Sequence, residues 1–432
     1  MPHVKRFARY ANQVERLVVS AASEPLSQER KKQIARALDG EPAAKLKQLE
    51  SIERLRQSGA FFTSPALAKQ LVRSLIPRLV NGVSVHDFAC GTGNLLTACA
   101  YHLPTSGDLQ QTLKLWGEYL GGNDIHEEFV RVAKARLALV AIDRGVTGKA
   151  PEPEDIFPRV RAADAFDQAP LADPQCITLN PPFTMTVAPT DCTWASGQVS
   201  NAALMLEACV LNAKPGTQVV AILPEVLRTG SHYERWRHVI ERAATIESVE
   251  IVGLFDKSTD IDVFIVRLTV SDSGETAKGS WWRSDRTEDI RKTTISDLFD
   301  VRVGPVVPHR DPHKGQWYPY VTAHHLPAWA TVNTDTGFAH RRFSGTTYIP
   351  PFLLVRRTSR PGDNHRAVAT LVTGRRAVAV ENHLLVLKPK DRLLRTCRSA
   401  IQRLGRTKAD TWLNERIRCR HLTVQSIKEM PW

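Results

Sequence analysis

One short stretch of the chain combines residues that can hold an amine. An apolar run over residues 177–179, typical of a buried strand, ends on Asn180-Pro181-Pro182-Phe183. Each proline fixes its own φ and keeps the residue before it out of the helical region, so this backbone is stiff. The stretch therefore offers a side-chain amide and fixed carbonyl acceptors beside an aromatic ring. Such a site suits an exocyclic amine held through both N–H groups while the ring stacks on a base.

Holding an amine in this way would activate it. The amine of adenine is a weak nucleophile because its lone pair is delocalised into the ring. Two fixed acceptors draw the nitrogen toward tetrahedral geometry and stabilise the positive charge that grows during attack, so no general base is needed first. An Asn-Pro pair after a strand is also an ordinary turn signal, and the four residues alone do not decide between the two interpretations.

A glycine-rich loop earlier in the chain can bind a ligand through its backbone. Residues 83–88 alternate as in a strand, Ala89-Cys90-Gly91-Thr92-Gly93-Asn94 follows, and a helix is expected from Leu95. Strand, glycine loop and helix open a Rossmann-like sheet, where small residues let a ligand approach the backbone. It is neither a dinucleotide fingerprint nor a P-loop, because Leu96 replaces the third glycine and the loop has no lysine. A plain tight turn remains the alternative.

Two acidic residues are expected at the same sheet edge as this loop. A second strand over residues 115–120 leads into Gly121-Gly122-Asn123-Asp124-Ile125, and a helix over 127–141 follows. An acid at the carboxyl end of the second strand is where a nucleoside ribose is held by its hydroxyls. Asp164 comes just before the strand that ends at Asn180. Both carboxylates are therefore predicted to lie near the glycine loop.

The surrounding elements divide the chain into three parts. Residues 1–55 are polar with helical spacing, which predicts two or three short helices. Residues 56–270 alternate strands and helices, which favours one doubly wound α/β domain. Residues 271–280 have the composition of a linker. Residues 281–432 are less regular, with short β-like runs followed by basic helices, which predicts an α+β domain.

Three connecting segments carry signals of their own. Residues 61–65 break the helical pattern, and Thr63 or Ser64 is suited to cap the next helix. A loop insertion is expected over residues 104–112. Residues 184–200, directly after the Asn-Pro-Pro-Phe tetrapeptide, show no clear periodicity and are interpreted as a mobile substrate loop.

The net charge of +13 is unevenly distributed. Residues 301–432 contain 23 Lys and Arg against 8 Asp and Glu, whereas residues 1–300 contain 35 against 37. A neutral body with a basic terminal third is typical of a catalytic domain joined to a nucleic-acid-binding module, although a basic surface that binds nothing has the same count. The candidate DNA-binding residues flank β-like runs in this third: Arg356, Arg357, Arg360, Arg375 and Arg376.

Composition places the chain among ordinary soluble proteins, with 42% apolar and 24% charged residues. No apolar run reaches transmembrane length, and no apolar segment follows the amino terminus as in a signal peptide, so we expect no membrane partner and a cytoplasmic location. The seven cysteines form no Cys-x-x-Cys pair. This favours reduced, structural thiols over a disulfide framework or a zinc site, and no metal is expected.

Five motifs stand in a recognisable order along the chain. They are Phe62-Thr63-Ser64-Pro65, Asp87-Phe88-Ala89-Cys90-Gly91-Thr92-Gly93, Asn123-Asp124, Ala163-Asp164-Ala165-Phe166 and Asn180-Pro181-Pro182-Phe183. This order resembles that of the gamma-class DNA adenine-N6 methyltransferases of type II restriction-modification systems. The resemblance covers residues 55–270 well and the remainder loosely. It implies a Rossmann-like class I S-adenosylmethionine-dependent methyltransferase domain over 56–270, preceded by N-terminal helices and followed by an α+β target-recognition domain over 281–432.

The resemblance also assigns roles to residues. It implies that S-adenosylmethionine is bound by Phe62, Thr63, Asp87, Ala89, Gly91, Gly93, Asn94, Asp124, Ile125, Asp164 and Ala165. Among these, Asp124 would hold the ribose and Asp164 the adenine amine of the cofactor. The implied catalytic residues, which would hold the target adenine, are Asn180, Pro181, Pro182 and Phe183. The family usually has proline in place of Phe88 and no residue in place of Ser64, which leaves Thr63 and Ser64 both open as the cofactor contact.

The implied reaction is a direct in-line transfer of a methyl group from the sulfonium to the amine, in which positioning supplies much of the rate. Because the amine is buried in duplex DNA, the adenine must be flipped into the pocket, at a cost of about a few kcal/mol, and Phe183 would stack on it there. Double-stranded DNA is therefore the expected substrate. A restriction endonuclease or another defence-system subunit is the expected protein partner.

Other enzymes share parts of this pattern. The tetrapeptide is similar to that of enzymes that methylate glutamine in release factors or bases in ribosomal RNA; the basic third disfavours the first and only tolerates the second. A cytosine-N4 enzyme more often has serine in place of Asn180, and a cytosine-C5 enzyme needs a Pro-Cys nucleophile, which the sequence lacks. A DNA-binding subunit with a degenerate pocket is disfavoured by the presence of Asp124, Asp164 and Asn180.

Overall fold

The computed structural model describes residues 4–150, 156–165, 174–256, 259–271, 281 and 293–432. The chain forms two compact units. The N-terminal unit comprises Met1–Arg228 and His232–Trp281, and the C-terminal unit comprises Thr229–Ser231 and Trp282–Trp432. Most of the linker expected over residues 271–280, and the last residue of the Ala163-Asp164-Ala165-Phe166 motif, lie outside the described residues.

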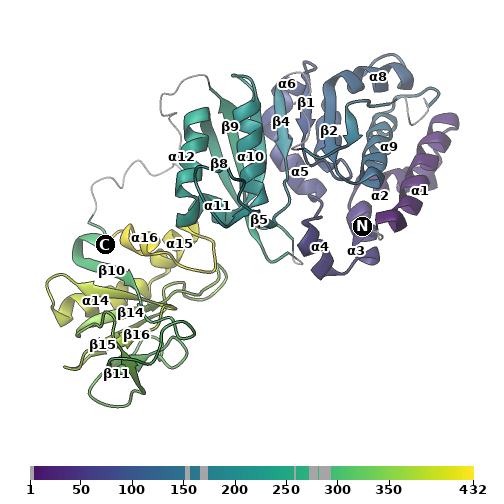
Figure 1. Cartoon of the computed structure of the whole chain (residues 1–432). Coiled ribbons are helices and arrows are strands. Elements are labelled where there is room, and N and C mark those ends of the chain that lie inside the picture. Colours follow the sequence, from purple (N-terminus) through teal and green to yellow (C-terminus); the bar gives the residue numbers. More distant parts are fainter. Residues whose placement is uncertain (1–3, 151–155, 166–173, 257–258, 272–280, 282–292) are drawn as a thin grey trace. The chain divides into compact units, whose positions relative to one another are not determined.

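A seven-stranded sheet forms the centre of the N-terminal unit (Figure 1). Its order is β3-β2-β1-β4-β7-β9-β8. The first five strands in this order are parallel, and β9 is antiparallel to both of its neighbours. Because the strand order reverses between β1 and β4, their carboxyl ends border the crevice in which such sheets bind ligands. The strands are β1 (Val85–Asp87), β2 (Leu120–Asp124), β3 (Val160–Ala162), β4 (Cys176–Leu179), β7 (Gln218–Pro224), β8 (Ala244–Leu254) and β9 (Asp262–Val270).

Helices connect and cover these strands. α10 and α12 lie side by side and contact β7 and β8, respectively (Figure 1). α9 is buried along most of its length and contacts α7 and α8, which brings Arg136 of α9 into the interior. The helices are α5 (Pro65–Val72), α6 (Ile76–Leu79), α7 (Asn94–Ala100), α8 (Leu109–Tyr119), α9 (Glu127–Asp143), α10 (Asn201–Asn212), α11 (Glu225–Thr229) and α12 (Glu234–Ala243), with 3-10 turns at Arg73–Leu75 and Ser231–Tyr233.

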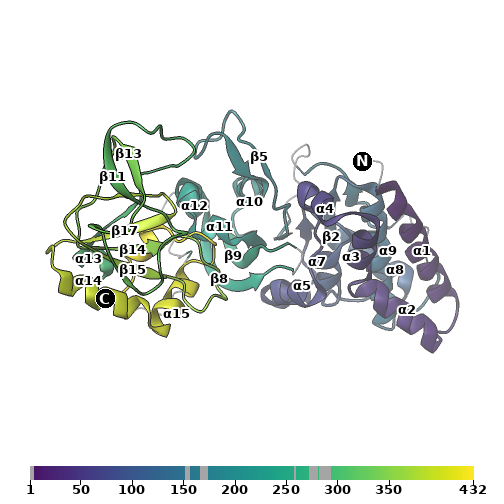
Figure 2. The same ribbon diagram turned by 90° about the horizontal axis from the view of Figure 1, so that it is seen from below.

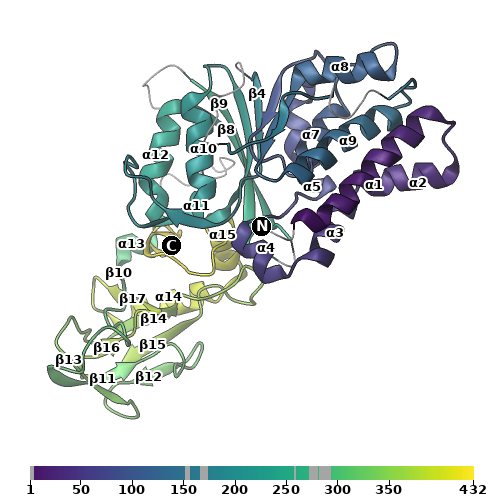
Figure 3. The ribbon, with the colours of Figure 1, turned by 45° about the vertical axis from the view of Figure 1, so that its right-hand side comes forward.

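Residues 4–58 form four helices, where two or three short ones were expected over residues 1–55: α1 (Val4–Ser23), α2 (Gln28–Leu38), α3 (Glu41–Leu49) and α4 (Ile52–Ser58). α1 lies along α9 (Figure 2 and Figure 3). Phe7 and Val14 of α1 are buried, and Arg131 of α9 donates through Nε to Glu15 of α1 at 2.9 Å. α2 also contacts α9. The segment expected as N-terminal helices over residues 1–55 thus shares one hydrophobic core with the sheet.

The strand predicted over residues 115–120 is wrong in position. Most of that segment belongs to α8, and the strand begins at Leu120. The reason is that Leu109, Leu113 and Trp116 recur at helical spacing and are buried on one side of α8. The side chain of Asp108 caps the start of this helix.

Two predicted loops contain regular structure. Part of the loop predicted over residues 104–112 belongs to α8. Residues 184–200, interpreted as a mobile loop, contain a β-hairpin of two antiparallel strands, β5 (Met185–Val187) and β6 (Gln198–Ser200). Three-residue strands are too short to show a periodicity in the sequence.

The C-terminal unit combines two sheets with helices. Its five-stranded sheet has the order β10-β17-β14-β15-β12, and its three-stranded sheet has the order β13-β11-β16. α14 packs on β14 and β15, and α16 packs on β10. The unit is α+β, as predicted. Its elements are α13 (Ile295–Leu298), β10 (Phe299–Val303), β11 (Gln316–Val321), β12 (Thr331–Asn333), β13 (His340–Phe343), β14 (Phe352–Arg356), β15 (Ala369–Thr373), β16 (Ala379–Val380), β17 (Leu384–Pro389), α14 (Leu394–Leu404), α15 (Thr407–Arg416) and α16 (Val424–Lys428).

Candidate active site

The residues expected at the sheet edge meet at a cavity of about 380 Å³ in the N-terminal unit. The cavity lies where the loops after β1, β2 and β4 approach one another, as the topology requires. Nine predicted residues line it: Phe62, Ala89, Gly91, Asp124, Ile125, Asp164, Ala165, Asn180 and Pro182. The other predicted residues of this unit are not on the cavity wall: Thr63, Asp87, Gly93, Asn94, Pro181 and Phe183.

The loop after β1 fits tightly between its neighbours. Gly91 and Gly93 have φ of 52° and 78°, a conformation that residues with a Cβ rarely adopt. A Cβ at Gly93 would lie 2.9 Å from the Cβ of Ala133 in α9, and one at Gly91 would lie 3.1 Å from the ring of Phe62. Gly91 therefore lets the backbone of the loop lie on the cavity wall beside Phe62, and Gly93 lets the loop pack closely on α9.

Asp87, the last residue of β1, is buried. Its Oδ1 accepts a hydrogen bond from the backbone N–H of Ala89 at 3.1 Å. Burial raises the pKa of Asp87 to about 7, the charge of Asp124 acts in the same direction, and the bond from Ala89 opposes the change. A cationic group bound near the loop would favour the ionised carboxylate.

Asp124, the last residue of β2, accepts hydrogen bonds from the loops that follow β1 and β2. Its Oδ2 accepts a hydrogen bond from the backbone N–H of Gly91 at 3.1 Å. Its Oδ1 accepts one from the backbone N–H of His126 at 2.9 Å and lies 2.9 Å from Nδ1 of the same residue. In the described part of the chain, Oδ2 accepts only the bond from Gly91 and has capacity for one more, which suits a ligand hydroxyl. The adjacent Ile125 is 66% exposed on the cavity wall and offers an apolar surface to a flat ligand.

Asn180 follows β4. The nitrogen of its side-chain amide is hydrogen-bonded, and within the described residues the oxygen is not. Its Nδ2 donates to Oγ1 of Thr63 at 2.9 Å and to the carbonyl of Phe61 at 3.3 Å. Because a carbonyl only accepts hydrogen bonds, the amide must turn its nitrogen toward Phe61. Oδ1 is buried and has no hydrogen-bond partner among the described residues. A buried acceptor in this state is a reason to expect a ligand.

Thr63 rather than Ser64 faces this amide. Thr63 is buried, and its hydroxyl accepts the bond from Asn180. Ser64 is exposed, and its hydroxyl accepts a hydrogen bond from the backbone N–H of Leu67 at 3.3 Å as the N-cap of α5. Ser64 therefore caps the helix, and Thr63 orients the side chain of Asn180.

A buried arginine of α9, which no sequence motif indicated, connects the site to the N-terminal helices. Arg136 donates to the carbonyls of Ala37 at 2.8 Å and Leu38 at 3.2 Å, at the end of α2. Its Nη1 donates to Oδ1 of Asn94, and Nδ2 of Asn94 donates to the carbonyl of Thr63. Burial lowers the pKa of Arg136 to about 10, which leaves it charged at neutral pH. A chain of hydrogen bonds thus runs from α2 to the residue that orients Asn180.

The rings in and near the tetrapeptide have different surroundings. The ring of Pro181 is buried. The ring of Phe183 is half-buried and stands edge-on to Phe255, with centroids 5.4 Å apart and an interplanar angle of 81°. Phe88 lines the cavity, with its ring centroid 4.3 Å from that of His86. The cavity wall therefore presents Phe88, whereas Phe183 packs on Phe255.

Other residues of the wall carried little signal in the sequence. His126 lies two residues after Asp124 and bonds its carboxylate, a local pattern that an acid at a turn often forms. Thr184, Asn201 and Met205 also line the cavity. They belong to no recognised motif, and two of them come from α10.

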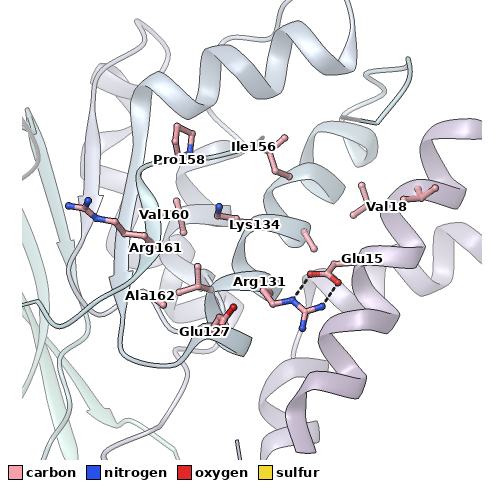
Figure 4. Close-up of a pocket in the computed structure, with 13 residues that line it drawn as sticks. Glu15, Val18, Glu127, Arg131, Lys134, Ile156, Pro158, Val160, Arg161 and Ala162 are labelled. Carbon is pink, nitrogen blue, oxygen red and sulfur yellow. Dashed lines mark hydrogen bonds and ion pairs between the residues drawn. The ribbon is translucent and has the colours of Figure 1, made fainter. Parts of the chain in front are cut away.

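A larger cavity, of about 670 Å³, lies elsewhere in the N-terminal unit (Figure 4). Residues of α1, α9 and the segment through β3 line it, and Figure 4 shows Glu15 and Arg131 paired at its wall. Burial lowers the pKa of Lys134, which also lines it. None of the predicted cofactor-binding or catalytic residues is on its wall. We therefore place the candidate site at the smaller cavity, where those residues converge.

The five arginines predicted to contact DNA have different surroundings in the C-terminal unit. Arg356 and Arg357 are half-buried, and each donates to a backbone carbonyl, at 2.6 Å and 2.9 Å respectively. Burial lowers the pKa of Arg357. The other three are exposed, and their guanidinium groups are accessible to phosphate: Arg360, Arg375 and Arg376.

The described part of the chain bears on the expectations about membranes, metals and thiols. No helix in it is long and apolar enough to span a membrane. No group of three or more His, Cys, Asp or Glu side chains in it is arranged to hold a metal ion. All seven cysteines are free thiols.

The doubly wound sheet, with a glycine loop after β1 and acids at the next strand ends, is the fold of class I S-adenosylmethionine-dependent methyltransferases, as predicted. A family model described as N-6 DNA Methylase matches residues 49–295. Because this match covers more than half of the 432 residues, the chain belongs to the N-6 DNA methylase family. The resemblance to DNA adenine-N6 methyltransferases is thereby confirmed.

Three solved structures are similar to the chain at low sequence identity. The type IIL restriction-modification enzyme MmeI, in complex with DNA, is 13% identical, with 93% of this chain and 67% of MmeI covered and a TM-score of 0.48. The type IIG restriction endonuclease BpuSI is 12% identical, with 100% and 70% covered and a TM-score of 0.47. A modification subunit assigned to a type I restriction enzyme from Vibrio vulnificus YJ016 is 18% identical, with 57% and 51% covered and a TM-score of 0.41. The chain spans about half the length of that subunit, and no curated protein matches the chain.

Proposed function

We propose that the chain is a site-specific DNA methyltransferase that transfers a methyl group from S-adenosylmethionine to the N6 amine of an adenine flipped out of duplex DNA. Membership of the N-6 DNA methylase family supports the methylation of DNA. The observation that carries the proposal is Oδ1 of Asn180, a buried acceptor without a partner among the described residues, on the wall of the cavity. An N–H of the target amine would supply the missing donor.

The residues of the cavity suit S-adenosylmethionine. Oδ2 of Asp124 retains acceptor capacity for a ribose hydroxyl, and the exposed Ile125 beside it suits the face of an adenine ring. Asp164 and Ala165 lie on the same wall, where the carboxylate of Asp164 would accept from the adenine amine of the cofactor. When bound, S-adenosylmethionine supplies the electrophilic methyl group on its sulfonium.

The glycine loop would receive the methionine part of the cofactor. Its backbone can come close to the cofactor at Gly91, which has no side chain and lies on the cavity wall. Asp87 lies at the start of this loop with a pKa of about 7, so a bound cation would convert more of it to the carboxylate near neutral pH. Phe62, beside Gly91, closes the cavity next to the loop.

The target amine would be held by Asn180 and the backbone of Pro181. Thr63 and the carbonyl of Phe61 hold the amide of Asn180 so that its oxygen, rather than its nitrogen, is left for the amine. Both acceptors act mainly in the transition state, because positive charge grows on the amine nitrogen only as it attacks. The side chains need not remove a proton before attack.

The ring of Phe183, which packs edge-on against Phe255 outside the cavity wall, would turn to stack on the flipped adenine. Flipping a base costs about a few kcal/mol, and stacking of a base on an aromatic side chain contributes about 1–3 kcal/mol. Pro182, on the cavity wall, would keep the backbone of the tetrapeptide stiff while this happens.

The basic C-terminal unit would hold the duplex. Its excess of Lys and Arg supports contact with phosphates, and the exposed Arg360, Arg375 and Arg376 suit such contacts better than Arg356 and Arg357, which already donate to carbonyls. A restriction endonuclease or another subunit of a defence system would be the protein partner of such an enzyme.

Modified-base sequencing tests the proposal directly. DNA from cells that express the chain should carry N6-methyladenine at one short sequence motif, and DNA from cells that express Asn180→Ala should not. Methylated cytosine at the motif, or methylation confined to RNA, would overturn the assignment of the substrate. Unmodified DNA from cells whose soluble wild-type protein binds S-adenosylmethionine would overturn the activity.

A further inference from the structure

The hairpin after the Asn-Pro-Pro-Phe tetrapeptide is joined to the proposed adenine site by a very short link. β5 begins two residues after Phe183. β5 and β6 pair antiparallel, with Met185 opposite Ser200 and Val187 opposite Gln198. In Figure 2 the hairpin extends away from the seven-stranded sheet. Its position is therefore tied to that of the catalytic residues.

One face of this hairpin carries two exposed apolar side chains, opposite the polar Gln198 and Ser200 of the other strand. Met185 and Val187 share a face because side chains alternate along a strand, and 55% and 68% of their surfaces are exposed. Val187 is the most exposed large apolar side chain that the structure describes. Val199, which belongs to the opposite face, is buried. The hairpin thus packs one face inward and turns two large apolar side chains toward solvent.

The hairpin is anchored at its base. The backbone N–H of Asn201 donates to the carbonyl of Thr184 at 3.0 Å, and Nδ2 of Asn201 donates to Oγ1 of Thr184 at 2.7 Å. The backbone N–H of Ser200 donates to the hydroxyl of Tyr233 at 3.1 Å. Because Thr184 and Asn201 also line the candidate cavity, the base of the hairpin is part of the site.

We infer that this hairpin acts on duplex DNA as a wedge, with Met185 and Val187 entering the base stack at the gap that the flipped adenine leaves. The inference rests on the proposed function. Flipping breaks base pairing and stacking. Apolar side chains inserted between base steps offset part of this loss, because their surface is removed from water when they enter the stack. The unbranched, flexible side chain of Met185 is suited to an irregular gap.

The position and composition of the hairpin favour DNA as its partner. A base that reaches Asn180 must leave its duplex beside the tetrapeptide, and the apolar face begins at the second residue beyond Phe183. The two strands carry no charged side chain, which suits contact with bases rather than with phosphates. A partner protein that covers the same face is the competing explanation.

The test compares two duplexes that carry the motif found by sequencing. In one the target adenine is paired with thymine, and in the other it faces an abasic site, so that flipping breaks no base pair. The double variant Met185→Ala/Val187→Ala should lower the single-turnover methylation rate on the paired duplex by about tenfold or more, but on the abasic duplex by about threefold or less. Met185→Leu, which keeps a long apolar side chain, should stay close to wild type on both.

Leu211→Ala is the matched control. Leu211 is as exposed as Met185, at 55%, but lies at the opposite end of α10 from the hairpin. All variants should bind S-adenosylmethionine like wild type in calorimetry, which shows that they are folded. Equal losses on both duplexes would mean that the hairpin shapes the pocket, and unchanged rates would leave the face to a partner protein; either result overturns the inference. Wild-type protein that methylates neither duplex would overturn the proposed function, and the inference with it.

Discussion

The candidate site and the basic surface of the C-terminal unit hold their polar groups in opposite ways. At the site, Asn180 is fixed by Thr63, Thr63 by Asn94, and Asn94 by Arg136, all through hydrogen bonds. In the C-terminal unit, Arg360, Arg375 and Arg376 are exposed. Stabilising a charge that appears only during a reaction requires acceptors fixed beforehand. Holding a phosphate backbone requires only charge that can adapt to it.

This difference predicts unequal effects of mutation. A substitution among groups that fix one another should remove one specific step of the reaction, whereas a substitution among exposed arginines should weaken binding in small, similar increments. Substitutions in the two regions test this difference.

The largest effect is expected at Asn180. Asn180→Ala should lower the methylation rate by about 10³-fold, in line with the loss of one fixed group that stabilises transition-state charge. Affinity for S-adenosylmethionine, measured by calorimetry, should stay close to wild type because the lost bond belongs to the target amine. Asn212→Ala, in the same unit, is the control and should keep full activity. Turnover retained by Asn180→Ala would remove Asn180 from the catalytic residues.

The next largest effect is expected at Thr63. Thr63→Val keeps the shape but removes the hydroxyl that orients Asn180, so kcat should fall by about 10–100-fold. Thr63→Ser restores the hydroxyl and should recover most of kcat. Measuring kcat and the Kd for S-adenosylmethionine together separates two roles of Thr63. A raised Kd with unchanged kcat would make Thr63 a cofactor contact, as the family resemblance implies. It would then not be a residue that positions Asn180.

Asp124→Ala should act on binding rather than on the chemical step. Loss of the hydrogen bonds from the ribose should weaken cofactor affinity by about 1–3 kcal/mol. The variant also loses the bonds from Gly91 and His126, so a thermal unfolding curve should accompany the calorimetry. Unchanged affinity in a folded protein would exclude Asp124 from the ribose site.

The smallest effects are expected in the C-terminal unit. Arg375→Ala with Arg376→Ala should reduce the log–log salt dependence of DNA binding by about 0.9 per lost phosphate contact and leave the free energy of unfolding unchanged. Arg356→Ala should instead lower the free energy of unfolding by about 1–3 kcal/mol, because it breaks a bond from a half-buried guanidinium to a carbonyl. Anisotropy titrations at several salt concentrations and chemical unfolding measure the two quantities. If both changes altered the salt dependence equally, the two kinds of arginine would not differ in function.

The sequence predicted that residues far apart in the chain meet at one edge of the sheet, because topology limits where strand ends can be. Once residues 83–95 are identified as strand, glycine loop and helix, the acids and the amide that follow the next parallel strands must come to one edge of the sheet. This is why Asp124, Asp164 and Asn180 share one cavity. The strand before Asp124 was misplaced by several residues, yet the prediction for Asp124 did not depend on where that strand began.

Groups outside any motif could not be found in this way. Arg136 acts through backbone carbonyls, which have no signature in the residues that supply them. The hairpin that contains Met185 could not be predicted because its strands are only three residues long and show no periodicity in the sequence. The excess of basic residues in the C-terminal third predicted that Arg356 and Arg357 contact DNA. A count of charges does not show which guanidinium groups are hydrogen-bonded to carbonyls inside the protein.

Arg136 also limits how this protein can be shortened. The family match begins at residue 49, after the end of α2, so a fragment cut there would keep the whole matched part. Such a fragment would lack α1 and α2, which pack on α9, and the carbonyls of Ala37 and Leu38, which accept hydrogen bonds from Arg136. The guanidinium that holds Asn94 would then be fixed from one side only. A fusion of this domain to a new targeting module should therefore retain the helices that precede residue 49. Its working boundary is set by hydrogen bonds and not by the extent of family likeness.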